Sequence, residues 1–249
     1  MTAGFSRLPL LVLVVAFACS REDAGAPARG AVTPLDPATT GTITGTVLYS
    51  GAPPPEGVLR FAGDPTCAAV HPGKVTAGDA LVRDGRVEAA FVYIQKGLEG
   101  RVFELPKQPV IIDQQGCLYV PHVVGAETGQ EIQFLNSDAT LHNVHLQPEN
   151  SSGVNFGMAV RGARRSIRIG KSEVMVKVRC DVHPWMRAFL GVLDHPYFAV
   201  SSRDGSFRLA NVPAGKYTLA VWHERFGVRS TEVVVGARGT TSADFTFGG

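Results

Sequence analysis

The amino-acid sequence predicts an all-β protein. Segments such as SEVMVKVR, residues 172–179, alternate apolar and polar residues and are rich in β-branched side chains, which is the pattern of a strand. In the last part of the chain, DG and PAG turn signals separate several such segments. Roughly 210 residues follow an N-terminal leader and tether, a length that suits one large β domain or two small ones.

Residues 1–19 have the layout of a signal peptide. One positive charge, Arg7, precedes an apolar run that is too short to span a bilayer. The run ends in AFAC, which resembles the cleavage box of a bacterial lipoprotein, although Ala16 stands where such boxes usually carry Leu. We therefore expect lipidation of Cys19, with plain cleavage and release as the alternative. Either event places the folded part in the periplasm or on the outer cell surface of a bacterium.

Residues 20–40 are rich in Ala, Gly, Pro and Thr and have no apolar period. This composition predicts a flexible tether. No later apolar run reaches membrane-spanning length, so we expect contact with a membrane only through the N-terminal lipid anchor.

The charge balance excludes one class of partner. The chain carries 24 Lys and Arg against 22 Asp and Glu, which gives no nucleic-acid signature, and we expect no nucleic-acid partner. One basic cluster comprises Arg161, Arg164, Arg165, Arg168 and Lys171. We interpret it as a solvated loop and strand edge, with docking of an acidic partner as the alternative.

Cysteine usage points to one disulfide and one free thiol. An exported protein lives where thiols oxidise, so its cysteines are expected in pairs. Cys67 and Cys117 lie in similar turn-like surroundings and are expected to pair. If Cys19 is removed or lipidated, Cys180 stays unpaired, and an unpaired thiol in such a compartment is usually buried, reactive or bound to a metal.

The neighbours of Cys180 favour a metal. Cys180 closes one predicted strand, AFLGVL starts another, and Pro184 prevents the loop between them from being a helix interior. Cys180, His183 and Met186 are spaced three apart in this loop, so thiolate, imidazole and thioether can converge. Soft sulfur ligands with imidazole suit copper, and two His and one Cys with a weak axial Met describe a blue-copper site. Zinc is the metallic alternative, but structural zinc rarely uses a thioether, and Met would occupy the water position of a catalytic zinc.

A second histidine is available in EIQFLNSDATLHNVHL, residues 131–146. EIQFL is strand-like, NSDAT is a turn, and HNVHL resumes the alternation with His142 and His145. Three residues apart on a strand, these two side chains point to opposite faces, so they do not both reach one ion unless the strand bends.

The stretches NSDATLHNVHL and CDVHPWM together resemble the ligand segments of the small blue-copper proteins, the cupredoxins. The resemblance covers residues 85–195 and implies a Greek-key β-sandwich or barrel with one copper ion, cycling between Cu(I) and Cu(II), per chain. By this resemblance His142, Cys180 and His183 are the equatorial ligands and Met186 is the axial one. His145 then lies beside the site without binding the ion.

The departures from the family pattern remove no ligand. Leu141 replaces the usual proline, and the residues between the loop ligands differ. Beside the ligands, we expect Asn143 to join the two ligand-bearing loops by hydrogen bonds. Pro184 lacks an N–H and so limits the donors near the thiolate.

The remaining histidines are His71, His122, His195 and His223, scattered singly among turn and strand residues. A surface or hydrogen-bonded role is expected for each. His122 deserves the first check, because PHVVG lies just upstream of the strand that carries His142 and could bring it near the metal.

A second β module flanks the copper segment. Residues 196–249 resemble the carboxypeptidase regulatory-like β-sandwich, in which an Asp-Gly-x-Phe strand precedes Pro-x-Gly-x-Tyr-x-Leu. Residues 41–84 contain GTITGTVLYSGAPPP, which fits the opening strand and turn of the same family. Either the copper domain is inserted into this sandwich or the two domains pack side by side, and the sequence leaves both open.

These observations predict a one-electron carrier rather than an enzyme. A site with Met as fourth ligand offers no open position for a substrate. The redox partner is expected to be a cytochrome or a dehydrogenase. Copper delivery or storage is the alternative, and an accessory binding protein with a structural copper is a further one. A copper enzyme would need a second copper with a substrate position, and no second histidine cluster is evident.

Overall fold

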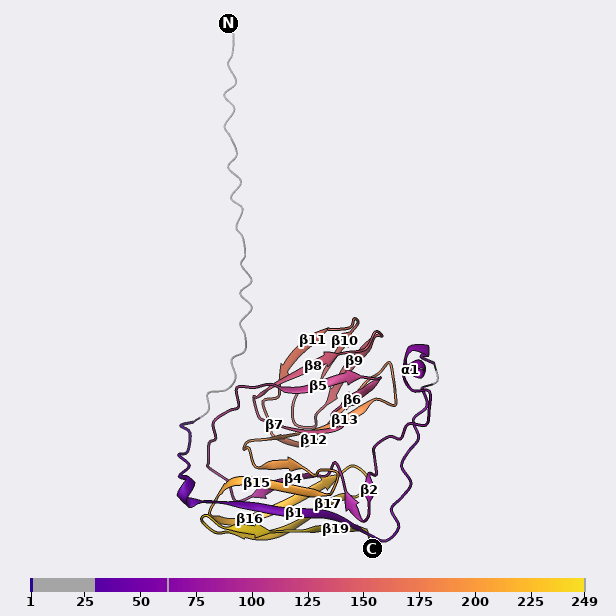
Figure 1. Cartoon of the computed structure of the whole chain (residues 1–249). Coiled ribbons are helices and arrows are strands. Elements are labelled where there is room, and N and C mark those ends of the chain that lie inside the picture. The colour runs from indigo at the N-terminus through magenta and orange to yellow at the C-terminus, as the bar shows by residue number, and fades with distance from the viewer. Residues whose placement is uncertain (2–29, 62, 249) are drawn as a thin grey trace.

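The structure is a computed structural model that describes residues 1, 30–61 and 63–248. Residues 2–19 of the predicted leader, which include the lipidation site Cys19, lie outside the described residues. The prediction of an all-β protein is confirmed, because strands dominate and, within the described ranges, only one short α-helix and one 3-10 turn are present. In that same part of the chain, no helix has the length and apolar character needed to cross a membrane. Figure 1 shows two β modules, one above the other.

The lower module in Figure 1, here called the host sandwich, is built from both ends of the described chain. One sheet has the order β15-β1-β3-β2, with β18 and β19 pairing parallel to β1, and the other has the order β14-β4-β16-β17. Its elements are η1 (Pro37–Thr39), β1 (Thr40–Ser50), β2 (Val82–Arg83), β3 (Arg86–Val87), β4 (Phe91–Lys96), β14 (Phe198–Val200), β15 (Ser206–Pro213), β16 (Gly215–His223), β17 (Gly227–Val235), β18 (Thr240–Ser242) and β19 (Phe245–Gly248).

The upper module, here called the inserted module, enters the chain between β4 and β14 of the host sandwich. Its two sheets have the orders β10-β9-β12-β13-β7 and β11-β8-β5-β6. Its strands are β5 (Val110–Gln115), β6 (Leu118–Val120), β7 (Val123–Glu127), β8 (Glu131–Asn136), β9 (His142–Gln147), β10 (Val154–Met158), β11 (Arg164–Arg168), β12 (Glu173–Arg179) and β13 (Arg187–Leu193). The connectivity therefore decides between the two arrangements that the sequence left open.

Alternating side chains make each module a sandwich. In β8, Ile132 and Phe134 are buried while Glu131, Gln133 and Leu135 are half-buried, as the period of two requires. These side chains join one apolar cluster of the inserted module, which also contains Cys180 and Met186. The host sandwich has its own cluster around Ile43, and burial of apolar surface is the main force that holds each module together.

A third apolar cluster joins the two modules. Phe91 of β4 lies against β7 and β13, where Gly125 and Gly191 leave room for its ring. A Cβ on Gly191 would lie 2.4 Å from the ring of Phe91, so no larger residue fits there without a shift. Gly125 and Gly191 thus act through close approach rather than through backbone freedom.

Charged groups reinforce the same junction. Asp79 is buried and accepts hydrogen bonds from Arg225 at 2.8 Å and from Arg187 at 3.3 Å. Glu224 pairs with His122 and, at 3.3 Å, with Arg187. Arg187 and His122 belong to the inserted module and Glu224 and Arg225 to the host sandwich, so these pairs connect the modules.

Two sequence-based boundaries and one local assignment need correction. The range 85–195 begins too early for the inserted module, because β4 pairs with β14 and β16 of the host sandwich. The tether predicted for 20–40 ends sooner, since Thr33 donates to and accepts from the backbone of Val102 before η1 forms. Cys67 lies in helix α1 (Pro65–Val70) rather than in a turn, because Asp64 caps the helix N-terminus and Pro65 occupies its first position.

Candidate metal centre

The predicted ligands lie at one end of three neighbouring strands of one sheet. β12 pairs with β13 on one side and with β9 on the other. Cys180 directly follows β12 and Met186 directly precedes β13, so the loop between these strands holds both. His142 is the first residue of β9, at the same end of the sheet. Pairing between strands distant in sequence therefore brings the two histidine-bearing stretches together.

The donor atoms converge in a buried place. Ligand atoms of His142, Cys180 and His183 all lie within 4.8 Å of one another. The two Nδ1 atoms of His142 and His183 are 2.9 Å apart, and Cys180 Sγ is 3.9 Å from His183 Nδ1. The three side chains are at most 3% exposed.

Each imidazole is oriented by a carboxylate. Nε2 of His142 lies 2.9 Å from an oxygen of Asp138, and Nε2 of His183 lies 2.9 Å from an oxygen of Asp64. An ionised carboxylate only accepts hydrogen bonds, so Nε2 of each ring carries the hydrogen. In neutral rings both Nδ1 atoms then present lone pairs to each other at 2.9 Å. Such an arrangement is unfavourable unless a cation lies between them, and it fits a metal bound through Nδ1.

The loop from Cys180 to Met186 is closed by its own backbone. The N–H of Met186 donates to the carbonyl of His183 at 2.9 Å, and the N–H of Cys180 donates to the carbonyl of Met186 at 3.3 Å. Met186 is 1% exposed. Two N–H groups, of His183 at 3.3 Å and of Asn143 at 3.5 Å, point to Cys180 Sγ. Pro184, which has no N–H, adds no donor to the sulfur.

Asn143 connects the two ligand-bearing segments, the role expected for it. Its side-chain oxygen accepts from the N–H of Asp181, and its nitrogen donates to Asp181 at 3.2 Å and to Asn155 at 2.6 Å. His145 points to the other face of β9 and bonds Asp181 at 2.9 Å, outside the group of converging donors. That hydrogen bond from His145 is the main cause that lowers the pKa of Asp181.

The pKa values of Asp64 and His142 favour the protonation states that suit a bound cation. The backbone N–H of Cys67, aided by His183 and Thr140 and opposed by desolvation, lowers the pKa of Asp64 to about 2. Asp64 is therefore ionised at neutral pH. Desolvation lowers the pKa of His142, and the neighbouring His183 adds to this effect against the opposing pull of Asp138. A neutral His142 is the form that binds a metal.

Cys67 and Cys117 form a disulfide beside the site. Asp138 accepts from the N–H groups of Gly116 and Cys117, both at 2.7 Å, and Asp64 accepts from that of Cys67 at 3.0 Å. Each carboxylate thus holds one half of the disulfide as well as one histidine. Two further groupings with metal-like spacing include Cys67 or Cys117. A disulfide sulfur is not a thiolate, so neither grouping is a separate metal site.

Sequence reasoning missed Asp64, Asp138 and the ring of Trp185. Trp185 lies 4.9 Å from the ring of His183 between centroids and donates from Nε1 to the carbonyl of Cys117 at 3.1 Å. The Asp-Pro pair at 64–65 signals a helix start, yet it carries no signal of a contact with His183, 119 residues away. Asp138 stands in the NSDAT turn, where a capping role would have been the default.

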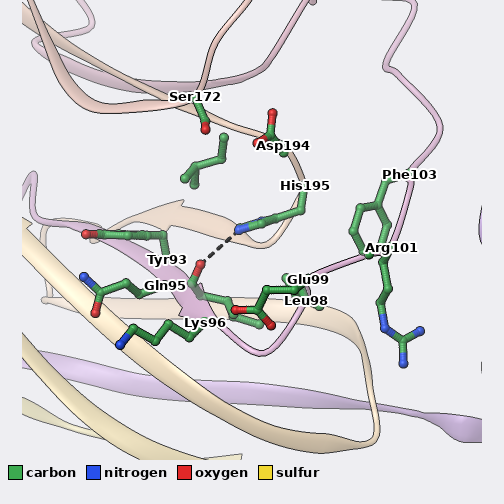
Figure 2. Close-up of a pocket in the computed structure, with 13 residues that line it drawn as sticks. Tyr93, Gln95, Lys96, Leu98, Glu99, Arg101, Phe103, Ser172, Asp194 and His195 are labelled. Atoms are coloured by element: carbon green, nitrogen blue, oxygen red, sulfur yellow. Dashed lines mark hydrogen bonds between the residues drawn. The ribbon is translucent and has the colours of Figure 1, made fainter. Parts of the chain in front are cut away.

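The other histidines lie away from the converging donors. His122 is held between the carbonyl of Arg187 and Glu224 at the module junction, so its predicted approach to the metal is not observed. His195 lines a cavity of about 460 Å³ between the modules (Figure 2). Its Nε2 donates to the carbonyl of Ile94 at 2.9 Å, the dashed line in Figure 2, and its Nδ1 accepts from the N–H of Tyr197 at 3.2 Å. Both ring nitrogens of His195 are satisfied.

The basic cluster lies on the edge strand β11 and its flanking turns, with every member exposed. Arg168 approaches Glu131 at 3.5 Å, and the guanidinium of Arg165 lies 4.7 Å from the ring centre of Phe156. These contacts agree with a solvated strand edge. Docking of an acidic partner there stays a prediction.

One family model and several solved structures resemble parts of the chain. A family model described as domain II of polysaccharide lyase family 4 matches residues 169–243, which run from β12 into the last strands of the host sandwich. The chain resembles a copper(I) form of an amicyanin variant with a TM-score of 0.31 and 18% identity, over 36% of this chain and 86% of that one. It also resembles an oxidised amicyanin variant with a TM-score of 0.32 and 17% identity, over 41% of this chain and 97% of that one.

A copper-containing nitrite reductase from Thermus scotoductus matches as well, with a TM-score of 0.31 and 20% identity over 42% of this chain and 25% of that one. No curated protein sequence matches the chain significantly. At such identities and TM-scores, the likenesses assign no function, which has to come from the donor atoms themselves.

Proposed function

We propose that the protein binds one copper ion and acts as a one-electron carrier rather than as an enzyme. One observation carries the proposal: two imidazole Nδ1 atoms face each other at 2.9 Å beside a buried free thiol. The loop that holds the thiol also contains the buried Met186. Two nitrogens, a thiolate and a thioether are the donor set that suits copper in a blue-copper site.

Copper in such a donor set supplies a single electron by cycling between its Cu(I) and Cu(II) states. The surrounding residues limit how far the ligands can move when the oxidation state changes. Carboxylates hold both histidines, Asn143 joins the two ligand segments, and backbone hydrogen bonds close the loop that carries Cys180 and Met186. Donors held in place reorganise little between the two oxidation states, which favours electron transfer.

Burial of the proposed ligands favours a carrier over the alternatives. His142, Cys180, His183 and Met186 are each at most 3% exposed, so a metal held by them is neither readily released nor open to a substrate. Release of copper to another protein requires accessible ligands. The burial of the proposed ligands therefore supports a copper ion that stays bound, rather than copper delivery or storage.

We further propose that the protein works outside the cytoplasm, held to the membrane by lipid on Cys19. The Cys67–Cys117 disulfide supports this location, because such bonds persist in oxidising compartments. An electron carrier there needs a redox protein as partner, for which a cytochrome or a dehydrogenase is our hypothesis.

The visible spectrum of the copper-loaded protein tests the proposed function. A thiolate bound to Cu(II) is expected to give an intense visible band with one copper per chain, and Cys180→Ser should remove that band. His142→Ala should open a position that added imidazole fills, with recovery of the colour. His145→Ala is the matched control and should leave the spectrum nearly unchanged, because His145 faces Asp181. A colourless copper-loaded protein, or loss of colour in His145→Ala but not in His142→Ala, would contradict the proposal.

A further inference from the structure

A segment of the host sandwich covers the metal centre. The chain leaves the sandwich after β1 and returns at β2, and the described residues in between, 51–61 and 63–81, are here called the capping segment. Figure 1 shows α1 of this segment beside the inserted module, away from β1 and β2. Phe61 and Cys67 of the segment belong to the apolar cluster of the inserted module. The covering is therefore part of the core and not a loose loop.

Rings and a covalent bond fasten the capping segment over His183. Phe61 contacts the edge of Trp185 with centroids 5.3 Å apart, and Trp185 in turn contacts His183. The disulfide from Cys67 to Cys117 anchors α1 to the β5–β6 turn. His183 is 2% exposed as a result of this covering and of its own loop.

Asp64 has two oxygens with two different tasks. Its Oδ1 accepts from the N–H groups of Thr66 at 2.8 Å and Cys67 at 3.0 Å, which caps helix α1. Its Oδ2 accepts from Nε2 of His183 at 2.9 Å and from the hydroxyl of Thr140 at 3.1 Å. The second pair of contacts plays no part in the cap.

We propose that Asp64 is a positioning residue for His183, supplied by the host sandwich, and that it sets the redox and binding properties of the metal centre. The proposal rests on the proposed function as a copper carrier. Asp64 fixes the hydrogen of His183 on Nε2, aims Nδ1 at the other donors and makes the imidazole a stronger ligand. Its negative charge stabilises Cu(II) more than Cu(I), so it lowers the reduction potential. The host sandwich is then part of the metal centre and not only a scaffold.

Two substitutions separate this role from helix capping. Asp64→Ser keeps a good N-cap oxygen, but the shorter side chain does not reach His183. Asp64→Asn keeps the length and loses the charge. Asp194→Asn is the matched control, since it removes the same charge from an exposed residue beyond β13 that is absent from the groups around the metal centre.

Redox titration and competition with a chelator measure the effect in the copper-loaded full chain. In Asp64→Ser and Asp64→Asn we expect a higher reduction potential and roughly 10-fold weaker copper binding, the lower end of what loss of such a partner costs. Asp194→Asn should match the unsubstituted protein. If Asp64→Ser had the same reduction potential and copper affinity as the unsubstituted protein, the proposal would be overturned. Capping of helix α1 would then be the whole role of Asp64.

Nitrogen NMR of the metal-free protein gives a second readout that does not depend on copper. His183 should carry its hydrogen on Nε2 with slow solvent exchange, and Asp64→Ser should make that exchange fast. A hydrogen on Nδ1 of His183, or exchange unaffected by Asp64→Ser, would overturn the proposal. If the loaded protein has no thiolate colour, the proposed function fails, and this measurement still decides whether Asp64 positions His183.

Discussion

Removal of the Cys67–Cys117 disulfide should be among the most destabilising changes that leave every proposed ligand intact. The bond closes a loop with a sequence separation of 50 residues. The chain-entropy relation for a loop of that length gives a loss of about 4 kcal/mol at 25 °C in the double variant Cys67→Ala/Cys117→Ala. Single domains are stable by only about 5–15 kcal/mol, so this loss is a large fraction of the whole.

Urea unfolding of the metal-free full chain, followed by tryptophan fluorescence, measures the loss. Trp185 reports on the site directly, because its Nε1 donates to the carbonyl of Cys117. The midpoint should fall, and the dependence on urea should steepen because the unfolded chain is no longer cross-linked.

Cys180→Ala controls for the deletion of a buried sulfur without loss of a cross-link, since Cys180 is free and 3% exposed. A loss in the double variant no larger than about 1 kcal/mol beyond that control would refute the reasoning. The capping segment would then be held by packing and by Asp64 rather than by the disulfide.

Three further predictions address the ligand set, the module junction and pH. Met186→Leu should retain copper and most of the colour, because the axial bond is weak, but shift the reduction potential upward in a redox titration, because an apolar side chain replaces an axial donor that helps to hold Cu(II); bleaching would show that Met186 is a strong ligand. Gly191→Ala should lower the free energy of unfolding by about 2 kcal/mol in urea titrations, because the new Cβ meets the ring of Phe91. Unchanged stability would mean that Phe91 moves aside without loss of packing. Burial lowers the pKa of His223 to about 4, so the unfolded chain binds its proton first and stability should fall by about 3 kcal/mol as the pH drops from 6.5 to 4. His223→Gln should flatten that decline, and an equal slope in both proteins would assign the acid sensitivity to other groups.

Local pattern was sufficient to locate the strands around the proposed ligands. Alternation in SEVMVKVR marks β12, and the turn and strand in NSDATLHNVHL mark the start of β9. The opposite orientations of His142 and His145 follow from the period of two alone, and the structure places one inside and the other against Asp181. Cysteines of an exported chain are expected in pairs, which was enough to expect a disulfide between Cys67 and Cys117. The structure has this disulfide. The identity of the metal stays a prediction.

Tertiary structure alone decided how the two modules are connected and what surrounds the ligands. The family resemblance placed β4 within the copper segment 85–195, and only its pairing with β14 and β16 assigns it to the host sandwich. His122 lies near the ligand strand in sequence, yet it faces Glu224 across the junction. Asp64 reaches His183 across 119 residues because a whole segment folds back over another module. Spacing along the chain reports contacts within a strand or a turn, whereas these contacts depend on which distant surfaces bury each other, and no local pattern carries that information.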